Sequence, residues 1–239
     1  QGNPLLEANP GGAPCNVLAM LEKLGKNCAF IGKVGDDLFG KMLRDEIVRA
    51  GICDDALLTD SEARTTLAFV KTFPNGDRDF SFYRNPGADM MLREDELPLA
   101  MLQDTRIFHF GTLSMTHPAV RRATKTADLT AKEAGAVISF DPNLRPPLWA
   151  NLEEAKAQIA WGLSQCDILK IADNEIDVVL FFGDPSQDNT RDVDALARLC
   201  DQHSIPFASN VATAEMLILG LQRGDLAWRD IVNPKKKAI

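Results

Sequence analysis

The chain has 239 residues, of which 45% are hydrophobic and 25% are charged, a balance typical of a soluble globular protein with one sizeable core. Its formal net charge of −8 and its pI near 4.9 predict no binding to nucleic acid, which requires clustered Lys and Arg. Neither an apolar run of about 18 residues nor a signal-peptide pattern is present, so we expect a cytoplasmic protein with no membrane partner. The five cysteines are scattered and form no CxxC pair, which predicts reduced thiols.

A glycine pair opens the most informative stretch of the chain. Gly11 and Gly12 precede a predicted helix from Asn16 to Leu24, so a ligand can approach the backbone beside the free N–H groups of the helix start. The Asn16 amide can both donate to and accept from a sugar hydroxyl. An ordinary loop and helix cap is the alternative interpretation. The spacing of Val17, Leu21 and Leu24 predicts one apolar stripe on this helix, and a short apolar strand is expected to end at Gly32.

The rest of the chain is predicted to be α/β, with a hairpin inserted near its middle. Strand-like runs at 65–73 and 78–84 are joined by a Pro-Asn-Gly-Asp turn, and Phe80, Phe82 and Arg84 share one face of the second strand. We therefore predict an α/β core of 1–64 and 85–239, a hairpin lid of 65–84, and a hinge at 85–89. Other expected helices are 38–50, 117–134, 152–164, 174–182 and 191–203, and expected strands are 106–111, 136–141, 167–172 and a short one near 205.

Polar residues follow two of the predicted strands, where ligands of parallel sheets bind. The run DPNLR places Asp141, Asn143 and Arg145 after one strand. The planar guanidinium of Arg145 can form two parallel hydrogen bonds with a phosphate or a carboxylate. Lys170, Asn174 and Asp177 follow the next strand. Helix caps, a solvated helix N-terminus and a surface lysine are the alternatives for these groups.

Three motifs together resemble the PfkB (ribokinase-like) family of carbohydrate kinases, closest to its fructokinase branch. They are the opening GGAPCN...GKVGDDLFG, the hairpin segment FSFYRNPGADM and the run DPNLR. The resemblance implies a ribokinase-like three-layer α/β/α fold with a mostly parallel sheet and a small β-hairpin lid. It implies that the sugar is bound by Gly11, Gly12, Asn16, Phe82, Arg84, Asn143 and Arg145. It further implies that ATP lies near Lys170 and Asn174, that Asp177 reaches Mg²⁺ through water, and that Arg145 stabilises the transferring phosphoryl group.

The second signature of the family, an Asp-Thr-x-Gly-Ala-Gly-Asp run that carries the catalytic Asp, is missing from this sequence. Its expected place is Val211–Glu215, just before a helix at Met216–Leu221. The strand and turn that line the nucleotide and the first strand with its acidic sugar ligand are also missing. We expect that the sequence omits segments of a longer protein and joins the pieces that flank them. The alternative is a protein that has lost its catalytic loop.

The function expected from this resemblance is ATP-dependent phosphorylation of a primary hydroxyl of a ketose, most simply fructose. A 2-keto-3-deoxygluconate kinase of the same family is the alternative, because Arg84 and Arg145 could take a sugar carboxylate. A nucleoside kinase is a more distant option, and a sugar-binding pseudokinase is the non-enzyme hypothesis. A two-stranded ribbon has little core of its own, so we also expect a homodimer formed through the hairpin.

Overall fold

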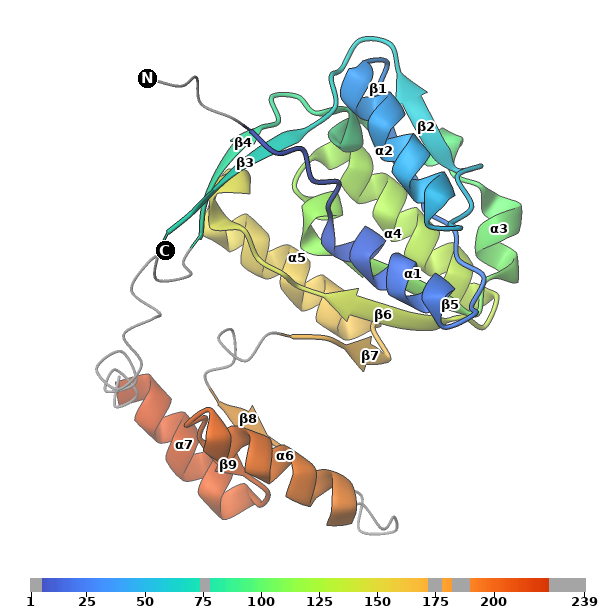
Figure 1. Cartoon of the computed structure of the whole chain (residues 1–239). Helices are drawn as coiled ribbons and strands as arrows, with labels where there is room; N and C mark the ends of the chain where they lie inside the picture. The colour runs from blue at the N-terminus through green and yellow to red at the C-terminus, as the bar shows by residue number, and fades with distance from the viewer. Residues whose placement is uncertain (1–5, 74–77, 172–177, 182–189, 224–239) are drawn as a thin grey trace. The chain divides into compact units, whose positions relative to one another are not determined.

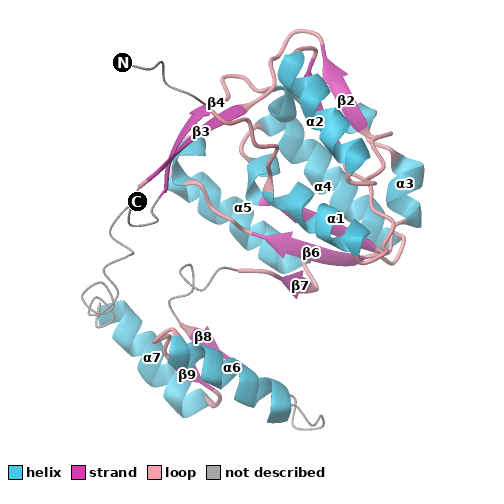
Figure 2. Cartoon of the chain, viewed as in Figure 1, coloured by secondary structure: helices cyan, strands magenta, loops and turns pink. Residues whose placement is uncertain are grey.

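The computed structural model describes residues 6–73, 78–171, 178–181 and 190–223 (Figure 1). The chain divides into two compact units, Gln1–Lys170 and Ile171–Ile239, and each is described here by itself. Helices and mostly parallel strands alternate along both units (Figure 2). Among the described residues, no helix has both the length and the apolar character needed to cross a membrane.

The first part of unit 1 pairs two parallel strands beneath two helices. Its elements are α1 (Ala13–Lys23), β1 (Gly32–Gly35), α2 (Leu38–Arg49) and β2 (Leu57–Asp60), with Gly32 of β1 opposite Leu57 of β2. Both helices pack on a core cluster formed by Val34, Ile47, Ile52 and Leu57. The strand predicted to end at Gly32 instead begins there, preceded only by a bridge between Ala29 and Cys53.

The position of β1 depends on a lysine that lies inside the fold. Lys33 is 7% exposed, and its Nζ lies 2.7 Å from Glu96 Oε1 and 3.4 Å from Asp60 Oδ2. Burial of a charge is tolerated only when it is paired, which these two carboxylates achieve. This pairing explains why the strand continues through a charged residue where the sequence predicted its end.

The apolar stripe predicted for α1 is on the wrong face of the helix. Val17 is 43% exposed and Leu24 is 65% exposed, whereas Cys15, Leu18 and Ala19 pack against the core cluster. No residue of α1 is fully buried, so the helix packs on the cluster through this half-buried side and leaves Val17 and Leu24 to solvent.

The predicted hairpin is present as an antiparallel ribbon of β3 (Leu67–Thr72) and β4 (Arg78–Tyr83). Its turn, 74–77, lies outside the described residues. The register pairs Val70 with Phe80 and Ala68 with Phe82. Because side chains alternate, Phe80 and Phe82 lie on one face, and Phe69 and Tyr83 lie on the other.

The second part of unit 1 is a three-stranded parallel sheet in the order β5-β6-β7. Phe110, Ile138 and Phe140 project from this sheet into a core cluster shared with α4 and α5, and a second cluster joins α3 and α4 to Phe108. The elements are η1 (Ala88–Met91), η2 (Glu94–Glu96), α3 (Leu99–Asp104), β5 (Ile107–Gly111), η3 (Thr112–Met115), α4 (Pro118–Glu133), β6 (Val137–Asp141), η4 (Pro146–Leu148), α5 (Leu152–Gln165) and β7 (Ile168–Leu169).

Unit 2 contains β8 (Val179–Leu180), α6 (Thr190–Gln202), β9 (Phe207–Ala208) and α7 (Val211–Arg223), and its two strands pair in parallel. The helix predicted at 174–182 is wrong where it is described, because Val179 and Leu180 form β8. The segment Val211–Glu215, where the catalytic loop of the family was expected, is the first turn of α7. Asn210 caps this turn, since its Oδ1 accepts a hydrogen bond from the Thr213 N–H at 3.0 Å.

Candidate active site

The glycine turn forms the start of α1 as predicted. Gly12 precedes the helix with φ 135°, a conformation that favours glycine, and it supplies no side-chain cap to the first turn. The N–H of Asn16 donates to the Gly12 carbonyl oxygen at 3.0 Å, and its side chain is exposed. The first N–H groups of α1 are therefore left for solvent or a ligand. The binding of a sugar by Gly11, Gly12 and Asn16 stays a prediction.

A pocket of about 280 Å³ lies between the hairpin and the loop after β6. Phe80 and Phe82 stack with ring centroids 6.0 Å apart and form an apolar wall, as the alternation of β4 predicted. The residues lining the pocket are Phe80, Phe82, Arg84, Asn85 and Met90 from the hairpin and its exit, and Pro147 and Leu148 from η4. Within the described chain, Gly11, Gly12, Asn16, Asn143 and Arg145 do not line it.

The Arg84 side chain lies at the base of this pocket and is only 5% exposed. Its Nε donates to Asp89 Oδ2 at 2.8 Å, and its Nη1 donates to Thr116 Oγ1 at 2.8 Å. The predicted contact of Arg84 with a sugar therefore has to share the guanidinium with partners inside the protein.

The loop after β6 carries the DPNLR run at the carboxyl end of the sheet. Asp141 is 4% exposed, and its Oδ2 pairs with Lys170 Nζ at 3.0 Å. Asn143 adopts φ 36°, in the left-handed region, and Arg145 donates from Nη1 to the Leu144 carbonyl oxygen at 2.9 Å. Arg145 directly precedes η4, two residues before the pocket wall of Pro147 and Leu148.

His109, for which no sequence motif predicted a role, lies on the same sheet. His109 and Ser139 are partners in the β5–β6 register, and His109 Nδ1 lies 2.9 Å from Ser139 Oγ. Burial lowers the pKa of His109 below its ordinary value, and Lys170 adds to this effect, while Asp141 opposes it. A neutral imidazole next to the Asp141–Lys170 pair is therefore expected at physiological pH.

The nucleotide and metal residues predicted from the sequence are only partly visible. Asn174 and Asp177 lie outside the described residues, and Lys170 pairs with Asp141 rather than standing alone. Asp141 Oδ1 is buried and has no hydrogen-bond partner among the described residues. The described chain contains no cluster of three or more His, Cys, Asp or Glu residues able to hold a metal. The buried Asp141 Oδ1 fits a Mg²⁺ that is held chiefly through the phosphates of a nucleotide and one or two carboxylates.

Several residues of the site were missed by sequence reasoning. Asp89, Thr116, Pro147 and Leu148 approach Arg84 and the pocket only through tertiary contacts. Of these, Asp89 alone had a signal, since it lies in the predicted hinge within the FSFYRNPGADM segment.

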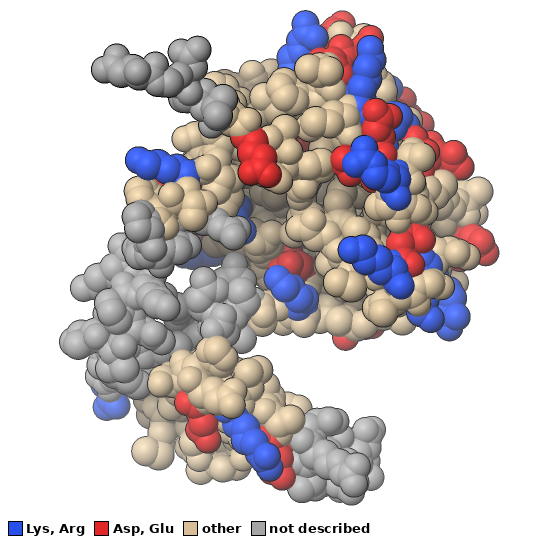
Figure 3. All heavy atoms as spheres, in the orientation of Figure 1, with Lys and Arg blue, Asp and Glu red and all other residues tan. Residues whose placement is uncertain are grey.

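Charged groups of both signs alternate over the described surface drawn in Figure 3, so that face of the molecule carries no extended single-sign stripe.

Residues 4–205 match the model of the pfkB family carbohydrate kinases. The chain belongs to this family. The fold class predicted from the sequence is thereby confirmed, because this pfkB chain has mostly parallel sheets and resembles solved structures of a fructokinase and a putative ribokinase II.

Three relatives show where this pfkB chain lies within the family. Fructokinase-1 of Zea mays is 46% identical over 168 residues, which cover 70% of this chain and 52% of the maize protein. The crystal structure of fructokinase from Xylella fastidiosa is 31% identical with a TM-score of 0.64, covering 92% of this chain and 62% of that one. The fructokinase of Vibrio cholerae O395 in fructose-, ADP- and calcium-bound form is 29% identical with a TM-score of 0.63, covering 69% and 53%. The chain thus spans about half the length of the curated relatives it matches.

Proposed function

We propose that the protein is an ATP-dependent kinase that phosphorylates a primary hydroxyl of fructose. The observation that carries this proposal is the pocket between the hairpin and the loop after β6, found in a chain 46% identical to a maize fructokinase. Its stacked phenylalanines offer an apolar wall to one face of a sugar ring, and Asn85 and Arg84 offer polar groups to its hydroxyls.

The remaining residues have proposed roles that follow phosphoryl-transfer chemistry. Gly11, Gly12 and Asn16 position the sugar, and the hairpin excludes water that would otherwise hydrolyse ATP. Arg145 stabilises negative charge on the transferring phosphoryl group, while Lys170 and Asn174 contact the nucleotide. When bound with ATP, Mg²⁺ would neutralise phosphate charge, and Asp141, together with Asp177 through water, would be the carboxylates on its side.

Two other functions could use the same pocket. A 2-keto-3-deoxygluconate kinase would use the same pocket for an acidic sugar. A sugar-binding protein without kinase activity is favoured by one observation, the lack of an Asp-Thr-x-Gly-Ala-Gly-Asp run in the sequence. In that case the pocket would bind a sugar and no phosphoryl transfer would follow.

Titration calorimetry with fructose and with 2-keto-3-deoxygluconate, and an assay of ADP formation from ATP with each sugar, test the three functions on one sample. We expect fructose to bind and to stimulate ADP formation. Binding without ADP formation would identify a sugar-binding protein, and turnover only with 2-keto-3-deoxygluconate would identify the acidic-sugar kinase. Failure of both sugars to bind would contradict the proposed function.

The Asn16→Ala variant tests the sugar contact at the start of α1. Loss of one hydrogen-bonding amide is expected to weaken fructose binding about tenfold, equivalent to ~1.4 kcal/mol. The midpoint of thermal unfolding should not change, because the side chain is exposed. Asn27→Ala, at an exposed asparagine beyond the other end of the same helix, is the matched control and should bind fructose normally. Equal affinities of the two variants would remove Asn16 from the site.

We further propose that the hairpin forms a homodimer with a second copy of the chain. Its face opposite the pocket carries Phe69 and Tyr83, 41% and 67% exposed, in an edge-to-face pair with centroids 5.2 Å apart. An exposed aromatic pair on a thin ribbon favours burial against a partner.

All five cysteines are free thiols, which supports a reducing compartment such as the cytoplasm.

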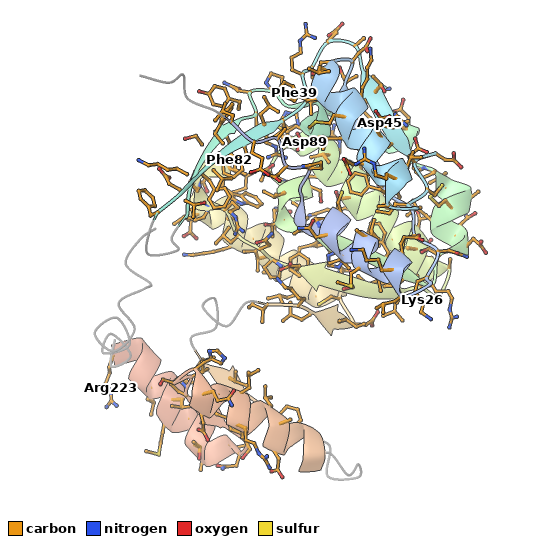
Figure 4. The ribbon with its side chains drawn as sticks, viewed as in Figure 1. Lys26, Phe39, Asp45, Phe82, Asp89 and Arg223 are labelled. Atoms are coloured by element: carbon orange, nitrogen blue, oxygen red, sulfur yellow. The ribbon has the colours of Figure 1, made fainter. Side chains whose placement is uncertain are left out.

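Light scattering at micromolar concentration is expected to give about twice the chain mass of 26.2 kDa. Phe69→Asp should give the monomer mass, since a carboxylate cannot be buried unpaired in the interface. Phe39→Asp is the control, because Phe39 on α2 is 38% exposed and lies outside the hairpin (Figure 4). A monomer mass for the unaltered chain would contradict dimerisation.

A further inference from the structure

The carboxylate of Asp89 connects both arms of the hairpin at its base. Its Oδ1 accepts a hydrogen bond from Thr66 Oγ1, directly before β3, and its Oδ2 accepts from Arg84, directly after β4. Asp89 lies in η1, the short helix that follows the hairpin, and Phe82 lies on β4 (Figure 4). One side chain therefore fixes the two points at which the ribbon leaves the core.

The backbone around Asp89 is arranged to allow these contacts. The Ala88 N–H donates to the Arg64 carbonyl oxygen at 2.8 Å, next to a parallel bridge between Arg64 and Gly87. A Cβ on Gly87 would overlap Thr66 Oγ1 and would lie 2.6 Å from Asp89 Oδ1. The absence of a side chain at Gly87 thus leaves the space in which Thr66 and Asp89 meet.

Arg84 is neutralised by the same carboxylate. Besides Asp89, its guanidinium contacts Thr116 Oγ1 at 2.8 Å through Nη1 and the Leu113 carbonyl oxygen at 3.0 Å through Nη2. A guanidinium has five N–H donors, and described residues occupy four of them. At most one donor remains for a ligand, and it belongs to a paired cation rather than a free one.

This pairing determines which sugars the pocket can accept. A sugar carboxylate that enters the pocket loses its hydration, and only an unpaired cation can offset the free energy of that desolvation. Here the cation at the base of the pocket already has a carboxylate, and a second one would add repulsion from Asp89. An uncharged sugar needs only hydrogen bonds, which the remaining Arg84 donor and the Asn85 amide can supply.

We propose that Asp89 is a positioning residue that holds Arg84 and both hairpin arms, and that it thereby makes the pocket selective for an uncharged sugar over a sugar acid. The preference rests on the proposed function, whereas the positioning role does not. Asp89 itself acts through Arg84 and Thr66 rather than through the substrate.

Calorimetry of fructose and 2-keto-3-deoxygluconate with the Asp89→Asn variant tests the preference. The unaltered chain is expected to bind fructose at least tenfold more tightly than the acid. In Asp89→Asn the side chain keeps its size and loses its charge, so this ratio should fall at least tenfold, mainly through tighter binding of the acid. Asp95→Asn is the matched control, because Asp95 also pairs with an arginine, Arg93 at 3.0 Å, but is 71% exposed and outside the pocket. An unchanged ratio in Asp89→Asn would overturn the selectivity.

A measurement without sugar tests the positioning role. Tyr83 is the only tyrosine in the sequence and ends β4, so 3-fluorotyrosine gives a single fluorine resonance from the hairpin. Asp89→Asn should shift or split this resonance, and Asp95→Asn should not. An unchanged resonance in Asp89→Asn would overturn the positioning role. If the unaltered chain binds neither sugar, the proposed function and the preference fail together, and the resonance alone decides the positioning role.

Discussion

Replacing Gly40 with alanine is expected to lower the free energy of unfolding by about 3 kcal/mol or more. Gly40 lies in the first turn of α2, where a Cβ would overlap the Gly35 carbonyl oxygen and lie 3.1 Å from Thr65 Oγ1. The neighbouring atom is rigid backbone, so either the helix or β1 has to move. Urea unfolding followed by circular dichroism measures the loss.

The same movement would break the cap of α2. Asp37 Oδ1 accepts from the Gly40 N–H and from Thr65 Oγ1, each at 2.8 Å, and its Oδ2 accepts from the Thr65 N–H at 2.9 Å. Partial burial raises the pKa of Asp37, but these hydrogen bonds outweigh it and hold the pKa below its ordinary value. Gly11→Ala is the control, because the nearest atom to its Cβ would be 3.9 Å away. Equal unfolding midpoints for the two variants would contradict the close packing inferred here.

Replacing Asp128 with leucine is expected to stabilise the fold by about 2 kcal/mol at pH 7. Asp128 lies on α4 with no exposed surface, and neither carboxylate oxygen has a hydrogen-bond partner among the described residues. A buried polar group without a partner costs free energy that an apolar side chain of similar size does not. Urea unfolding of the two proteins at several pH values measures the difference.

The pH dependence of this difference has a definite sign. Burial raises the pKa of Asp128, Lys132 opposes that rise, and Asp167 adds to it. Folding therefore takes up a proton between the unfolded and folded pKa values, so the contribution of Asp128 is fully present below the unfolded value of about 3.9 and is lost as pH rises through the folded one. The advantage of Asp128→Leu should grow over that interval.

Two further variants separate charge from packing at Asp128. Asp128→Asn cannot ionise and should show the same loss of pH dependence with a smaller gain in stability, since its amide is still buried. Glu133→Gln removes an acid from the exposed side of the same helix and should leave the pH profile unchanged. A constant difference between the unaltered chain and Asp128→Leu at all pH values would show that Asp128 does not titrate as inferred.

Local sequence signals predicted most of the elements of unit 1. The turn sequence between the two runs predicted the hairpin, and apolar periodicity predicted α2, α4 and α5 to within a few residues. The exceptions arise where tertiary contacts decide. β1 continues through Lys33 because Glu96 and Asp60 pair with it. α1 packs on the core cluster through the half-buried Cys15, Leu18 and Ala19 rather than through the predicted stripe.

The site was predictable only where one element carries it. Phe80, Phe82 and Arg84 share a face because side chains alternate along β4, and this needs no knowledge of the rest of the fold. The opposite wall, Pro147 and Leu148, comes from a loop whose path depends on the contact between Thr112 and the Pro142 carbonyl oxygen. Asp89 was visible in a motif, but its partner Thr66 lies 23 positions away. Thr116, which accepts a hydrogen bond from Arg84, lies 32 positions from that arginine, and both separations are beyond any local pattern.

The carboxylates of Asp37 and Asp89 hold the base of the hairpin and restrict where it can bend. Asp37 anchors Thr65, and Asp89 anchors Thr66 and Arg84, so the junction with the core cannot serve as a pivot without breaking several hydrogen bonds at once. Swinging of the whole ribbon as a rigid flap is therefore disfavoured. Flexing instead has to spread along β3 and β4, whose six residues each reach about 20 Å. The ends of β3 and β4 far from the core would then move more than the base, where Arg84 lines the pocket.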